Sequence, residues 1–565
     1  MLNYTWEIKP QPSEEAVTSL SEAINISPVL ASILVQRGVQ TFEQAKTYFR
    51  PELSDLHDPF FMKDLDKAVN RISEAIQNGD KILVYGDYDV DGSTSVALFY
   101  GFFRKYTEQL DYYIPDRYSE GYGVSSQGIE YAKEKGVSVI VTIDCGIKAI
   151  DKIAKAKEYG IDVIICDHHR PGDVLPPAYA ILDPKQKDCT YPYDELCGCG
   201  VAFKLIQGFC QQNSIDESEA FEFLDLVAVA TCSDIVPITG ENRVLVSMGL
   251  KQLNTNPRPG LKALIELGGF KNDLNVTNVV FGIGPRINAA GRIDHAHGAV
   301  KLLLAESTEA AHSFGVKVNE KNNLRRDFDS SITQEALRMI EEDEQLMQAK
   351  STVLFKNDWH KGVIGIVASR CIENHYRPTI ILTESNGKAT GSARSVHGFD
   401  VYEAITSCAD LLEQFGGHTY AAGLTMKMEN VPAFQKRFEE IVSASITEEQ
   451  LVPKISIDQV LTFDQITSKF FSVLTQMGPF GPQNMQPTFI SENVVDNGKS
   501  RIVKDTHLKI GVKQNGVEIN GIGFGLAHHY EQIRTGVPFH ICYNLEENHF
   551  NGKTTLQLMV KDIRF

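Results

Sequence analysis

The chain has 565 residues and a formal net charge of −18, so it is long enough for several domains and is globular by composition. This acidic balance excludes broad electrostatic adhesion to nucleic acids or membranes, so a polyanionic partner has to be bound by local arginines or by metal ions. No run approaches the apolar length of a transmembrane helix, and the first residues lack the charged start and apolar core of a signal peptide.

From residue 80 to about 235, short apolar runs alternate with helical patterns. The runs are KILVY, LDYYIP, VSVIVTID, GIDVIICD and YAILD, and the helices between them fall near 93–106, 125–135 and 147–159. This alternation predicts an α/β domain with a doubly wound, mostly parallel sheet that helices cover on both faces. Ligands of such sheets bind at the carboxyl ends of the strands.

Acidic residues follow three of the predicted strands: Asp87, Asp89 and Asp91, then Asp144, then Asp167. The first three have the spacing that begins a calcium-binding EF-hand loop. That loop requires a Glu at its twelfth position, where this chain has Leu98, and it requires a helix before it. Because KILVY predicts a strand, we interpret the stretch as a strand, an acidic turn and then a helix.

The stretch ICDHHRPG places His168 and His169 directly after a predicted strand and an aspartate. A second histidine pair, His528 and His529 in AHHYE, follows no such aspartate, and we interpret it as structural. Asp234 in ATCSDIVP is a further acidic residue at the end of an element. We therefore expect His168 and His169 to converge with Asp234 and with the strand-end aspartates.

A cluster of carboxylates requires cations. Two carboxylates about 4 Å apart repel each other by roughly 4 kcal/mol at an effective dielectric constant of 20. Mixed Asp and His ligation suits Mn²⁺ or Mg²⁺ better than a metal that prefers thiolates. Two such ions bridged by one carboxylate could hold a hydroxide nucleophile and neutralise charge on a phosphoryl group. The cluster thus predicts metal-dependent chemistry on phosphates.

The ten cysteines lack the spacing of a disulfide framework, so we expect reduced thiols in the cytoplasm. The stretch CGCG at 197–200 could suggest a metal site, but no second cysteine pair completes a zinc site. We interpret it as small residues that line a tight turn.

Four other regions flank or follow these motifs. Residues 1–79 predict a helical region that packs on the core, and the catalytic domain is expected to span 80–305. Residues 306–348 are charged and nearly free of Gly and Pro, which predicts a long connecting helix. Residues 349–447 contain STVLF, PTIIL and KATGSAR and predict a smaller α/β domain. From 453 to 565, short strands separated by DNG, QNG and FNG turns are typical of a small all-β barrel or sandwich.

The motifs DYDVDG, TIDCG, CDHH and CSDIVP resemble, in that order, the four motifs of the DHH phosphoesterase superfamily. Four further stretches narrow the resemblance: FGIGPRINAAGRID, GVIGIVASR, GSARS and FGGHTYAAG. Together they resemble the RecJ family of bacterial single-strand-specific exonucleases over about residues 20 to 565. This resemblance implies a DHH domain, a DHHA1 domain and a C-terminal OB-fold. It also implies the removal of nucleotides from the 5′ end of single-stranded DNA, in DNA repair and recombination.

The resemblance implies a two-metal centre that holds Mn²⁺ or Mg²⁺. The implied metal ligands are Asp89, Asp91, Asp144, His168 and Asp234. Asp89 would bind one ion, Asp91 and Asp234 would bind the other, and Asp144 would bridge them. The implied catalytic residues are Asp144, His168 and His169, of which His169 would contact the scissile phosphate or a metal.

Two positions near the first motif stand apart from this ligand set. Asp87 is expected to support the ligands without binding a metal. Related pyrophosphatases carry a histidine four residues before the first ligand, and this chain departs from that pattern with Tyr85.

The resemblance assigns substrate binding at the 5′ phosphate to Arg117, Arg286, Asn288, Ser392, Arg394 and His418. Guanidinium groups suit terminal phosphates because these accept bidentate contacts. Two alternatives remain open: the arginines pair with the abundant surface acids, and FGGHTYAAG is a plain turn. The implied partner is single-stranded DNA, with a helicase and a single-strand-binding protein as further candidates, no membrane, and a monomeric chain.

The C-terminal region carries aromatic residues among its turns, as in MGPFGPQNMQPTF. OB-folds bind strands by stacking bases on aromatic side chains, so this stretch is a candidate DNA contact. Two other functions remain: a phosphodiesterase of short oligonucleotides or cyclic dinucleotides, and a non-catalytic scaffold that binds single strands. A small-substrate enzyme gains little from an OB-fold, and a scaffold has no need of clustered carboxylates.

Overall fold

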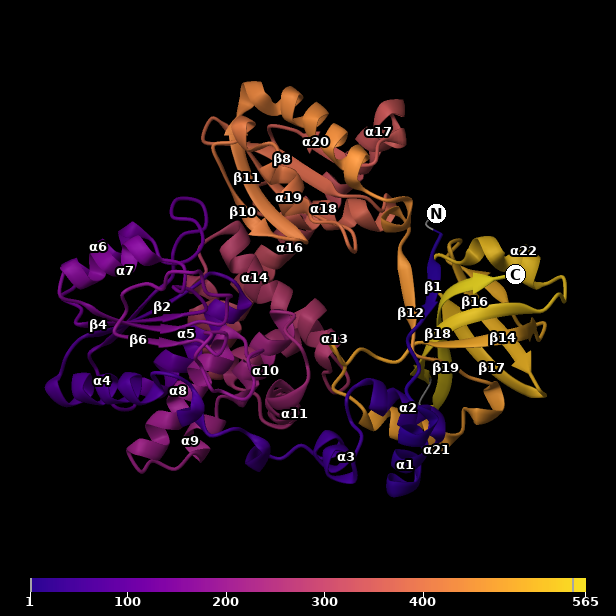
Figure 1. Ribbon diagram of the computed structural model, residues 1–565, viewed down its shortest axis with the longest axis horizontal. Coiled ribbons are helices and arrows are strands. Elements are labelled where there is room, and N and C mark those ends of the chain that lie inside the picture. The colour runs from indigo at the N-terminus through magenta and orange to yellow at the C-terminus, as the bar shows by residue number, and fades with distance from the viewer. Residues whose placement is uncertain (1–2, 551–552) are drawn as a thin grey trace. The chain divides into compact units, whose positions relative to one another are not determined.

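The computed structural model describes residues 3–550 and 553–565. The chain forms two compact units, which Figure 1 displays with all their elements. The larger unit contains Ser13–Asn323 and Ser472–Gln486, and the smaller unit contains Met1–Pro12, Leu324–Phe471 and Pro487–Phe565. The two units are therefore not consecutive pieces of the sequence, because each takes segments from distant parts of the chain.

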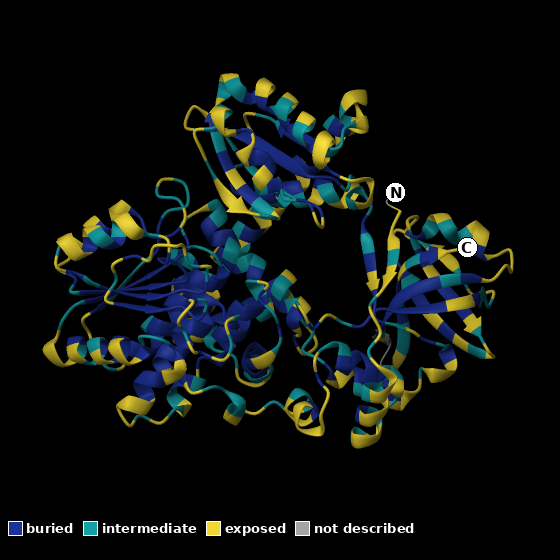
Figure 2. Cartoon of the chain, in the orientation of Figure 1, coloured by how far each residue is buried: buried dark blue, intermediate teal, exposed yellow. Residues whose placement is uncertain are grey.

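The larger unit is built on a five-stranded sheet with the strand order β3-β2-β4-β5-β6, and all of its pairs are parallel. The strands are β2 (Ile82–Gly86), β3 (Leu110–Tyr113), β4 (Val139–Ile143), β5 (Asp162–Cys166) and β6 (Ala180–Leu182). Every residue of β2 and β4 is buried, as Figure 2 shows in dark blue. Full burial on both faces is typical of parallel sheets, and the predicted fold class is confirmed.

Helices cover both faces of this sheet. They are α4 (Leu65–Asn78), α5 (Val90–Phe103), α6 (Ser126–Glu134), α7 (Ile150–Glu158) and α8 (Gly198–Gln212). Successive strand residues point to opposite faces, so Ile82 and Val84 join one core with α4, α5 and α8. Leu83 and Tyr85 join the other core with α6 and α7.

A helical layer follows the sheet in the chain. It contains α9 (Ser218–Phe221), α10 (Leu224–Ser233), α11 (Gly240–Thr255), α12 (Pro259–Gly268), α13 (Val276–Asn278), the π-helical turn Val279–Ile283, α14 (Gly284–Ile293) and α15 (His297–Leu303). The apolar helix α10 packs against both α5 and α11. It thereby brings its last turn, which precedes Asp234, to the start of α5.

The region before residue 80 begins with a strand, which corrects the expectation of a wholly helical region. Strand β1 (Thr5–Ile8) pairs in parallel with β12 (Lys454–Ile457) and belongs to the smaller unit. The helices α1 (Glu14–Ile24), α2 (Pro28–Gln36) and α3 (Phe42–Phe49) belong to the larger unit. Within the described residues, no single helix is long and apolar enough to cross a membrane, and α1 with α2 qualifies only as a pair bent by 114°.

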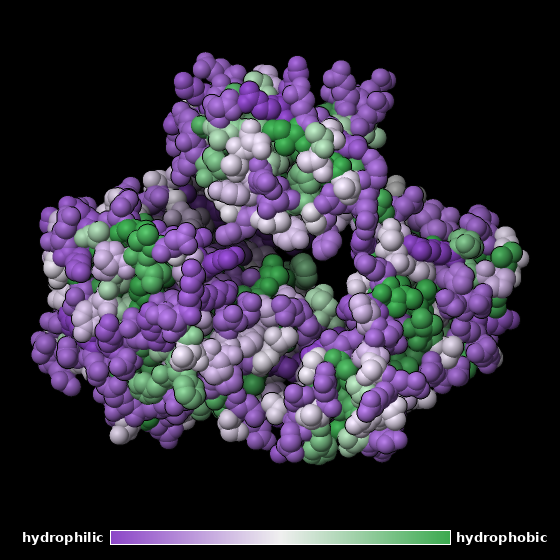
Figure 3. All heavy atoms as spheres, viewed as in Figure 1, coloured by the Kyte–Doolittle hydropathy of each residue, from purple (hydrophilic) through white to green (hydrophobic). Residues whose placement is uncertain are grey.

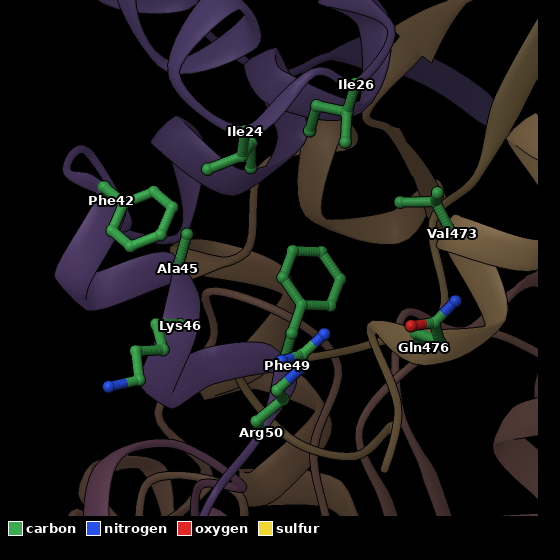
Figure 4. A pocket seen from close by; sticks show the side chains of 9 residues that line it. All are labelled: Ile24, Ile26, Phe42, Ala45, Lys46, Phe49, Arg50, Val473 and Gln476. Atoms are coloured by element: carbon green, nitrogen blue, oxygen red, sulfur yellow. The ribbon is translucent and has the colours of Figure 1, made fainter.

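An apolar pocket of about 260 Å³ lies among these N-terminal helices and α21 (Ser468–Gln476). Figure 4 shows Phe42 and Ala45 on one side, Val473 and Gln476 on the other, and the ring of Phe49 between them. None of the site residues predicted from the sequence lines this pocket, so it is distinct from the candidate active site.

The long connecting helix is present as α16, which runs from Thr308 to Glu341 over 34 residues, and α17 (Glu344–Gln348) follows it. A mixed sheet with the order β10-β11-β9-β8-β7 comes next. Its strands are β7 (Thr352–Phe355), β8 (Thr379–Ser385), β9 (Lys388–Arg394), β10 (Gln414–His418) and β11 (Ala421–Lys427). Its helices are α18 (Ile364–Asn374), α19 (Val401–Thr406) and α20 (Val431–Ser445).

The C-terminal strands close into a barrel. They are β13 (Gln459–Val460), β14 (Phe489–Asp496), β15 (Arg501–Val503), β16 (His507–Gln514), β17 (Val517–Gly523), β18 (Phe539–Phe550) and β19 (Lys553–Arg564), with α22 (Tyr530–Ile533) before β18. The order β14-β18-β19-β17-β16 is closed by a further pairing of β14 with β16, which confirms the predicted OB-type barrel.

Turn chemistry explains the hairpins of this barrel. Asn515 and Gly516, which join β16 to β17, both have positive φ angles of 50° and 81°, as a two-residue hairpin turn requires. The predicted FNG turn falls at 550–552 and lies largely outside the described residues. On the face drawn in Figure 3, hydrophilic side chains cover most of the surface, in keeping with the 23% of charged residues.

Candidate active site

The acidic turn after β2 holds its carboxylates through helix N-termini. Asp89 is the N-cap of α5, and its Oδ1 accepts a hydrogen bond of 3.0 Å from the backbone N–H of Gly92. Asp91 accepts hydrogen bonds from the N–H groups of Gly198 (2.6 Å) and Cys199 (2.8 Å). These two donors open α8, where backbone N–H groups lack partners within the helix and favour a negative charge.

The stretch CGCG is therefore the start of a helix, and our interpretation of it as a tight turn was wrong. The small residue Gly198 lets the backbone at the start of α8 approach Asp144 closely, since a Cβ atom on Gly198 would lie 2.6 Å from the Cβ of Asp144. The buried thiol of Cys197 caps the helix by accepting a hydrogen bond from the N–H of Gly200.

His168 lies at the centre of the acidic cluster. It follows β5, and its Nε2 atom is 3.2 Å from Oδ1 of Asp144 and 3.6 Å from Oδ2 of Asp234. The same nitrogen is 3.9 Å from Oδ2 of Asp91. Asp144 follows β4, and Asp234 ends α10. Three strand or helix ends thus converge on one imidazole, as we expected from acidic residues at the ends of elements.

Two groups of side chains are close enough to share an ion, because their ligand atoms lie within 4.8 Å of one another. One group contains Asp91, His168 and Asp234, and the other contains Asp144, His168 and His169. Asp89 belongs to neither group, although its charge acts on the neighbouring carboxylates.

Burial and mutual repulsion shift the pKa values of the cluster. Burial raises the pKa of Asp91 to about 7, and the charge of Asp89 adds to this effect. Burial likewise raises the pKa of Asp144 and of Asp234 well above the usual range, with further contributions from their acidic neighbours. Burial lowers the pKa of His168 to about 3, so its imidazole is neutral at neutral pH.

Several buried atoms of the cluster lack the hydrogen bonds that buried polar groups normally make. Both ring nitrogens of His168 and Oδ2 of Asp234 have no hydrogen-bond partner among the described residues. Neutral imidazole nitrogen and carboxylate oxygen are ligands of divalent cations. The residues present therefore fit a centre for Mn²⁺ or Mg²⁺.

His169 is held by residues that were absent from the predicted site. Its Nδ1 is 2.7 Å from Oδ1 of Asp167, and its Nε2 is 3.1 Å from the hydroxyl of Tyr122. The Tyr122 hydroxyl donates to the backbone oxygen of Asp144 at 3.1 Å. Burial alone would lower the pKa of His169, but the hydrogen bond and charge of Asp167 raise it above its ordinary value.

Asp87 and Tyr85 both lie outside the two ligand groups. Asp87 is fully buried, and its Oδ1 accepts a long hydrogen bond of 3.4 Å from the N–H of Gly123. The Tyr85 ring points to the opposite face of the sheet, where it stacks on Tyr113. Its hydroxyl accepts a hydrogen bond from the N–H of Ser125 at 3.0 Å. The side chain at the usual histidine position is therefore part of the core.

Three predicted phosphate contacts belong to the larger unit. The guanidinium of Arg117 lies 4.8 Å from the centre of the Tyr88 ring, beside the acidic turn. Arg286 donates to the backbone oxygen of Gly282 at 2.6 Å and to Oδ1 of Asn319 at 3.0 Å. Asn288 lies on the same helix, α14, and is partly exposed.

The other three predicted contacts belong to the smaller unit and lie at one end of its sheet. Arg394 donates to the hydroxyl of Ser392 at 3.0 Å on β9. His418, which is exposed, pairs with Ala421 across the β10–β11 hairpin, and Ala421 also pairs with Arg394. A Cβ atom on Gly365 would lie 2.8 Å from both Arg394 and Ser392, so the N-terminal turn of α18 approaches them closely. FGGHTYAAG thus forms a hairpin next to this arginine.

The aromatic stretch MGPFGPQNMQPTF has a different place from the one we expected. Residues 472–486 pack with the larger unit. The buried guanidinium of Arg243 donates to the backbone oxygens of Met477 (3.1 Å) and Gly478 (2.6 Å), and Pro482 accepts from the N–H of Ile238 (2.9 Å). This part of the stretch joins two regions of the chain, a role that composition alone did not indicate.

Comparisons with known proteins agree with this architecture. Residues 81–231 match the DHH family N-terminal domain, residues 348–444 match the DHHA1 domain, and residues 457–562 match the RecJ OB domain. The chain is similar to a protein of Bacillus subtilis named single-stranded-DNA-specific exonuclease RecJ. The two are 40% identical over 99% of this chain and 70% of the relative.

Two further similarities extend over nearly the whole chain. The Escherichia coli protein of the same name is 32% identical over 95% of this chain and 96% of the relative. The crystal structure of RecJ in complex with Mn²⁺ from Thermus thermophilus has a TM-score of 0.86 and 27% identity, covering 100% of this chain and 80% of that one. The chain therefore belongs to the RecJ family of single-stranded-DNA-specific exonucleases.

Proposed function

We propose that this protein is a metal-dependent exonuclease that hydrolyses phosphodiester bonds of single-stranded DNA from the 5′ end, in DNA repair and recombination. The observation that carries the proposal is the buried cluster around His168, whose ring nitrogens have no hydrogen-bond partner among the described residues. Relatives named RecJ supply the substrate class, and the T. thermophilus structures contain Mn²⁺ or Mg²⁺.

The metal centre would be held by Asp89, Asp91, Asp144, His168 and Asp234. Divalent cations held by these residues would activate water at neutral pH and neutralise the charge that develops on the phosphoryl oxygens. By the family resemblance Asp144 would contact both ions, and its Oδ1 lies 3.2 Å from Nε2 of His168.

The surrounding residues orient the ligands and the substrate. The N-terminus of α8 fixes both oxygens of Asp91, so this carboxylate stays directed at the centre. Asp167 holds the Nδ1 side of His169, which leaves the Nε2 side toward Tyr122 and the cluster. In this arrangement His169 is placed to donate a hydrogen bond to an oxygen of the scissile phosphate.

Substrate binding is assigned to Arg117, Arg286 and Asn288 in the larger unit and to Ser392, Arg394 and His418 in the smaller one. Arg394 and Ser392 lie together beside the N-terminus of α18, and helix N-termini favour phosphate groups. The closed barrel binds the strand further from its end, by stacking bases on aromatic side chains.

The same family relationship supports a proposal for the cellular setting. We place the enzyme in the cytoplasm as a monomer, working with a helicase and a single-strand-binding protein that supply and present the strand. All ten cysteines of the described chain are unpaired, as a reducing compartment favours.

The decisive test is degradation of the same single strand carrying a label at either its 5′ or its 3′ end, with and without Mn²⁺. We expect labelled mononucleotides first from the 5′-labelled strand, only in the presence of the metal, and little degradation of a blunt duplex. Early release of the 3′ label, or equal rates in excess chelator, would contradict the proposal.

A further inference from the structure

We infer that Asn242 is a positioning residue that ties together the two loops holding Asp91 and Asp234. It lies in the first turn of α11 and is completely buried. Its side-chain Nδ2 donates to the backbone oxygen of Glu195 at 2.6 Å and to that of Pro237 at 3.0 Å. The inference rests on the metal centre proposed above, since it concerns how this chain places two of the ligands.

The first of these loops leads into α8. Glu195 lies three residues before Gly198, and the segment between them is buried. Gly198 and Cys199 are the residues whose N–H groups hold the two oxygens of Asp91. A shift of the backbone at Glu195 would therefore move the N–H groups that orient the carboxylate of Asp91.

The second loop leads out of α10. Asp234 ends this helix, and Pro237 lies three residues later. Ile235 between them has a φ angle of 65°, which is strained for a β-branched residue and persists only where surrounding contacts hold it. Pro237 accepts from Asn242 and also, at 3.3 Å, from the hydroxyl of Tyr193. The hydrogen bond from Asn242 is thus one of the contacts that hold Asp234 in place.

The amide group suits this task better than other side chains. Two backbone oxygens from different loops require two N–H donors at one position, and the NH₂ of asparagine provides both. The Oδ1 atom of Asn242 has no hydrogen-bond partner among the described residues, so burying this amide destabilises the fold. Packing alone does not explain why a polar side chain stands at this position. Asp at this position would place carboxylate oxygens against two carbonyl oxygens.

Its neighbours in sequence keep Asn242 rigid. Oε1 of Glu241 accepts from Nζ of Lys204 at 2.9 Å, and Oε2 accepts from the hydroxyl of Tyr191 at 2.6 Å. Arg243 donates to the backbone oxygen of Tyr48 at 2.8 Å. Three consecutive buried polar residues therefore stabilise the start of α11. The central one, Asn242, connects the loop before α8 with the loop after α10.

The test measures metal binding apart from catalysis. Free Mn²⁺ is titrated by electron paramagnetic resonance against the full-length protein without DNA, for the parent and for Asn242→Leu. The matched control is Asn254→Leu on the same helix, because Asn254 also braces a backbone segment, exchanging hydrogen bonds of 3.0 and 2.7 Å with Leu274. Both substitutions remove a side-chain amide that binds a distant backbone segment, but of the two only Asn242 contacts the loops that lead to α8 and from α10.

We expect Asn242→Leu to weaken Mn²⁺ binding about tenfold, while Asn254→Leu lowers the melting temperature and leaves Mn²⁺ affinity within about twofold of the parent. Excess Mn²⁺ should restore most of the turnover rate of Asn242→Leu. Asn242→Ser, which keeps one donor and is smaller, should fall between the parent and the leucine variant.

Equal Mn²⁺ affinities for the parent and both Asn242 variants would overturn the inference. Equal weakening by Asn254→Leu would also overturn it, because the effect would then be general destabilisation. Should Asn242→Leu fail to fold, the serine variant decides the question by the same comparison. A parent protein that binds no Mn²⁺ would instead contradict the proposed metal-dependent function, which keeps the two failures distinct.

Discussion

The Nδ1 atom of His169 lies 2.7 Å from Oδ1 of Asp167, the aspartate that precedes the histidine pair. Burial alone would raise the pKa of Asp167, but the hydrogen bond and charge of His169 lower it, so the carboxylate is ionised. Asp167 also accepts from the N–H of Ile147 at 2.9 Å and lies outside both ligand groups. We therefore expect Asp167 to orient His169 and not to bind a metal ion.

Asp167→Asn should lower the turnover rate about tenfold to a hundredfold, because the amide keeps the shape but loses the charge that orients the imidazole. Mn²⁺ affinity should change little. Steady-state rates and Mn²⁺ titrations on the same samples check this, with the exposed Asp151→Asn as the control. A loss of Mn²⁺ affinity as large as the loss of rate would instead place Asp167 among the metal-holding residues.

Asp144→Ala should abolish hydrolysis and leave the protein folded. The substitution removes the proposed bridging carboxylate, and it also removes a buried acid whose pKa is raised by burial and by repulsion from its acidic neighbours. The melting temperature of the metal-free protein should therefore stay the same or rise, whereas Asp173→Ala in an exposed loop should change neither property. Substantial activity in folded Asp144→Ala protein would rule out the two-metal assignment.

Arg394→Ala should reduce the use of strands with a 5′ phosphate far more than that of strands with a 5′ hydroxyl. Charge-assisted hydrogen bonds of this kind are worth about 1.5–3 kcal/mol, which corresponds to a loss of roughly tenfold to a hundredfold in kcat/KM. The control is Arg437→Ala, whose guanidinium pairs with Asp410 at the surface of the same unit. An equal loss on both strands would assign Arg394 to folding or to internal phosphates.

Removal of the barrel should change the thermal stability of the larger unit by an amount that depends on where the chain is cut. A chain ending at residue 452 loses the backbone oxygens of Met477 and Gly478 that accept from Arg243, which is only 4% exposed. Unsatisfied buried donors cost about 1–3 kcal/mol, so this chain should unfold at a lower temperature. A chain ending at residue 486 retains these partners and should melt near the parent value for the larger unit.

Both truncated chains should bind long single strands more weakly, because base stacking in an OB-fold contributes about 1–3 kcal/mol per base. Cleavage of short oligonucleotides should survive in the chain ending at residue 486. Arg243→Met should restore part of the stability lost by the shorter chain, since it removes the unsatisfied guanidinium. Equal melting temperatures of the two truncations would show that residues 472–486 do not support the larger unit.

The sequence by itself determined the order of strands and helices and the acidic residues at their ends. Parallel strands bury both faces, so their apolar runs are continuous and easily found, and the turns after them carry the polar residues that remain. Asp144 and His168 could therefore be placed at one edge of a sheet from the pattern alone, whereas Asp234 ends helix α10, which packs against α5. The long helix α16 and the hairpin turn at Asn515 were also predictable from the local sequence. The helix was indicated by its helical pattern and the hairpin by its turn residues.

Only the tertiary structure decided which groups support those residues. The N–H groups that hold Asp91 come from positions 107 and 108 residues later in the chain, and Asn242 joins Glu195 to Pro237 through backbone oxygens. The backbone N–H and C=O groups are the same in all residues except proline, so the pattern of side chains in the sequence does not indicate such contacts. The same holds for residues 477–486, the part of the aromatic stretch MGPFGPQNMQPTF that packs with the larger unit, although its composition suggested a DNA contact. Their place beside Arg243 follows from packing between segments more than 200 residues apart, which local periodicity does not encode.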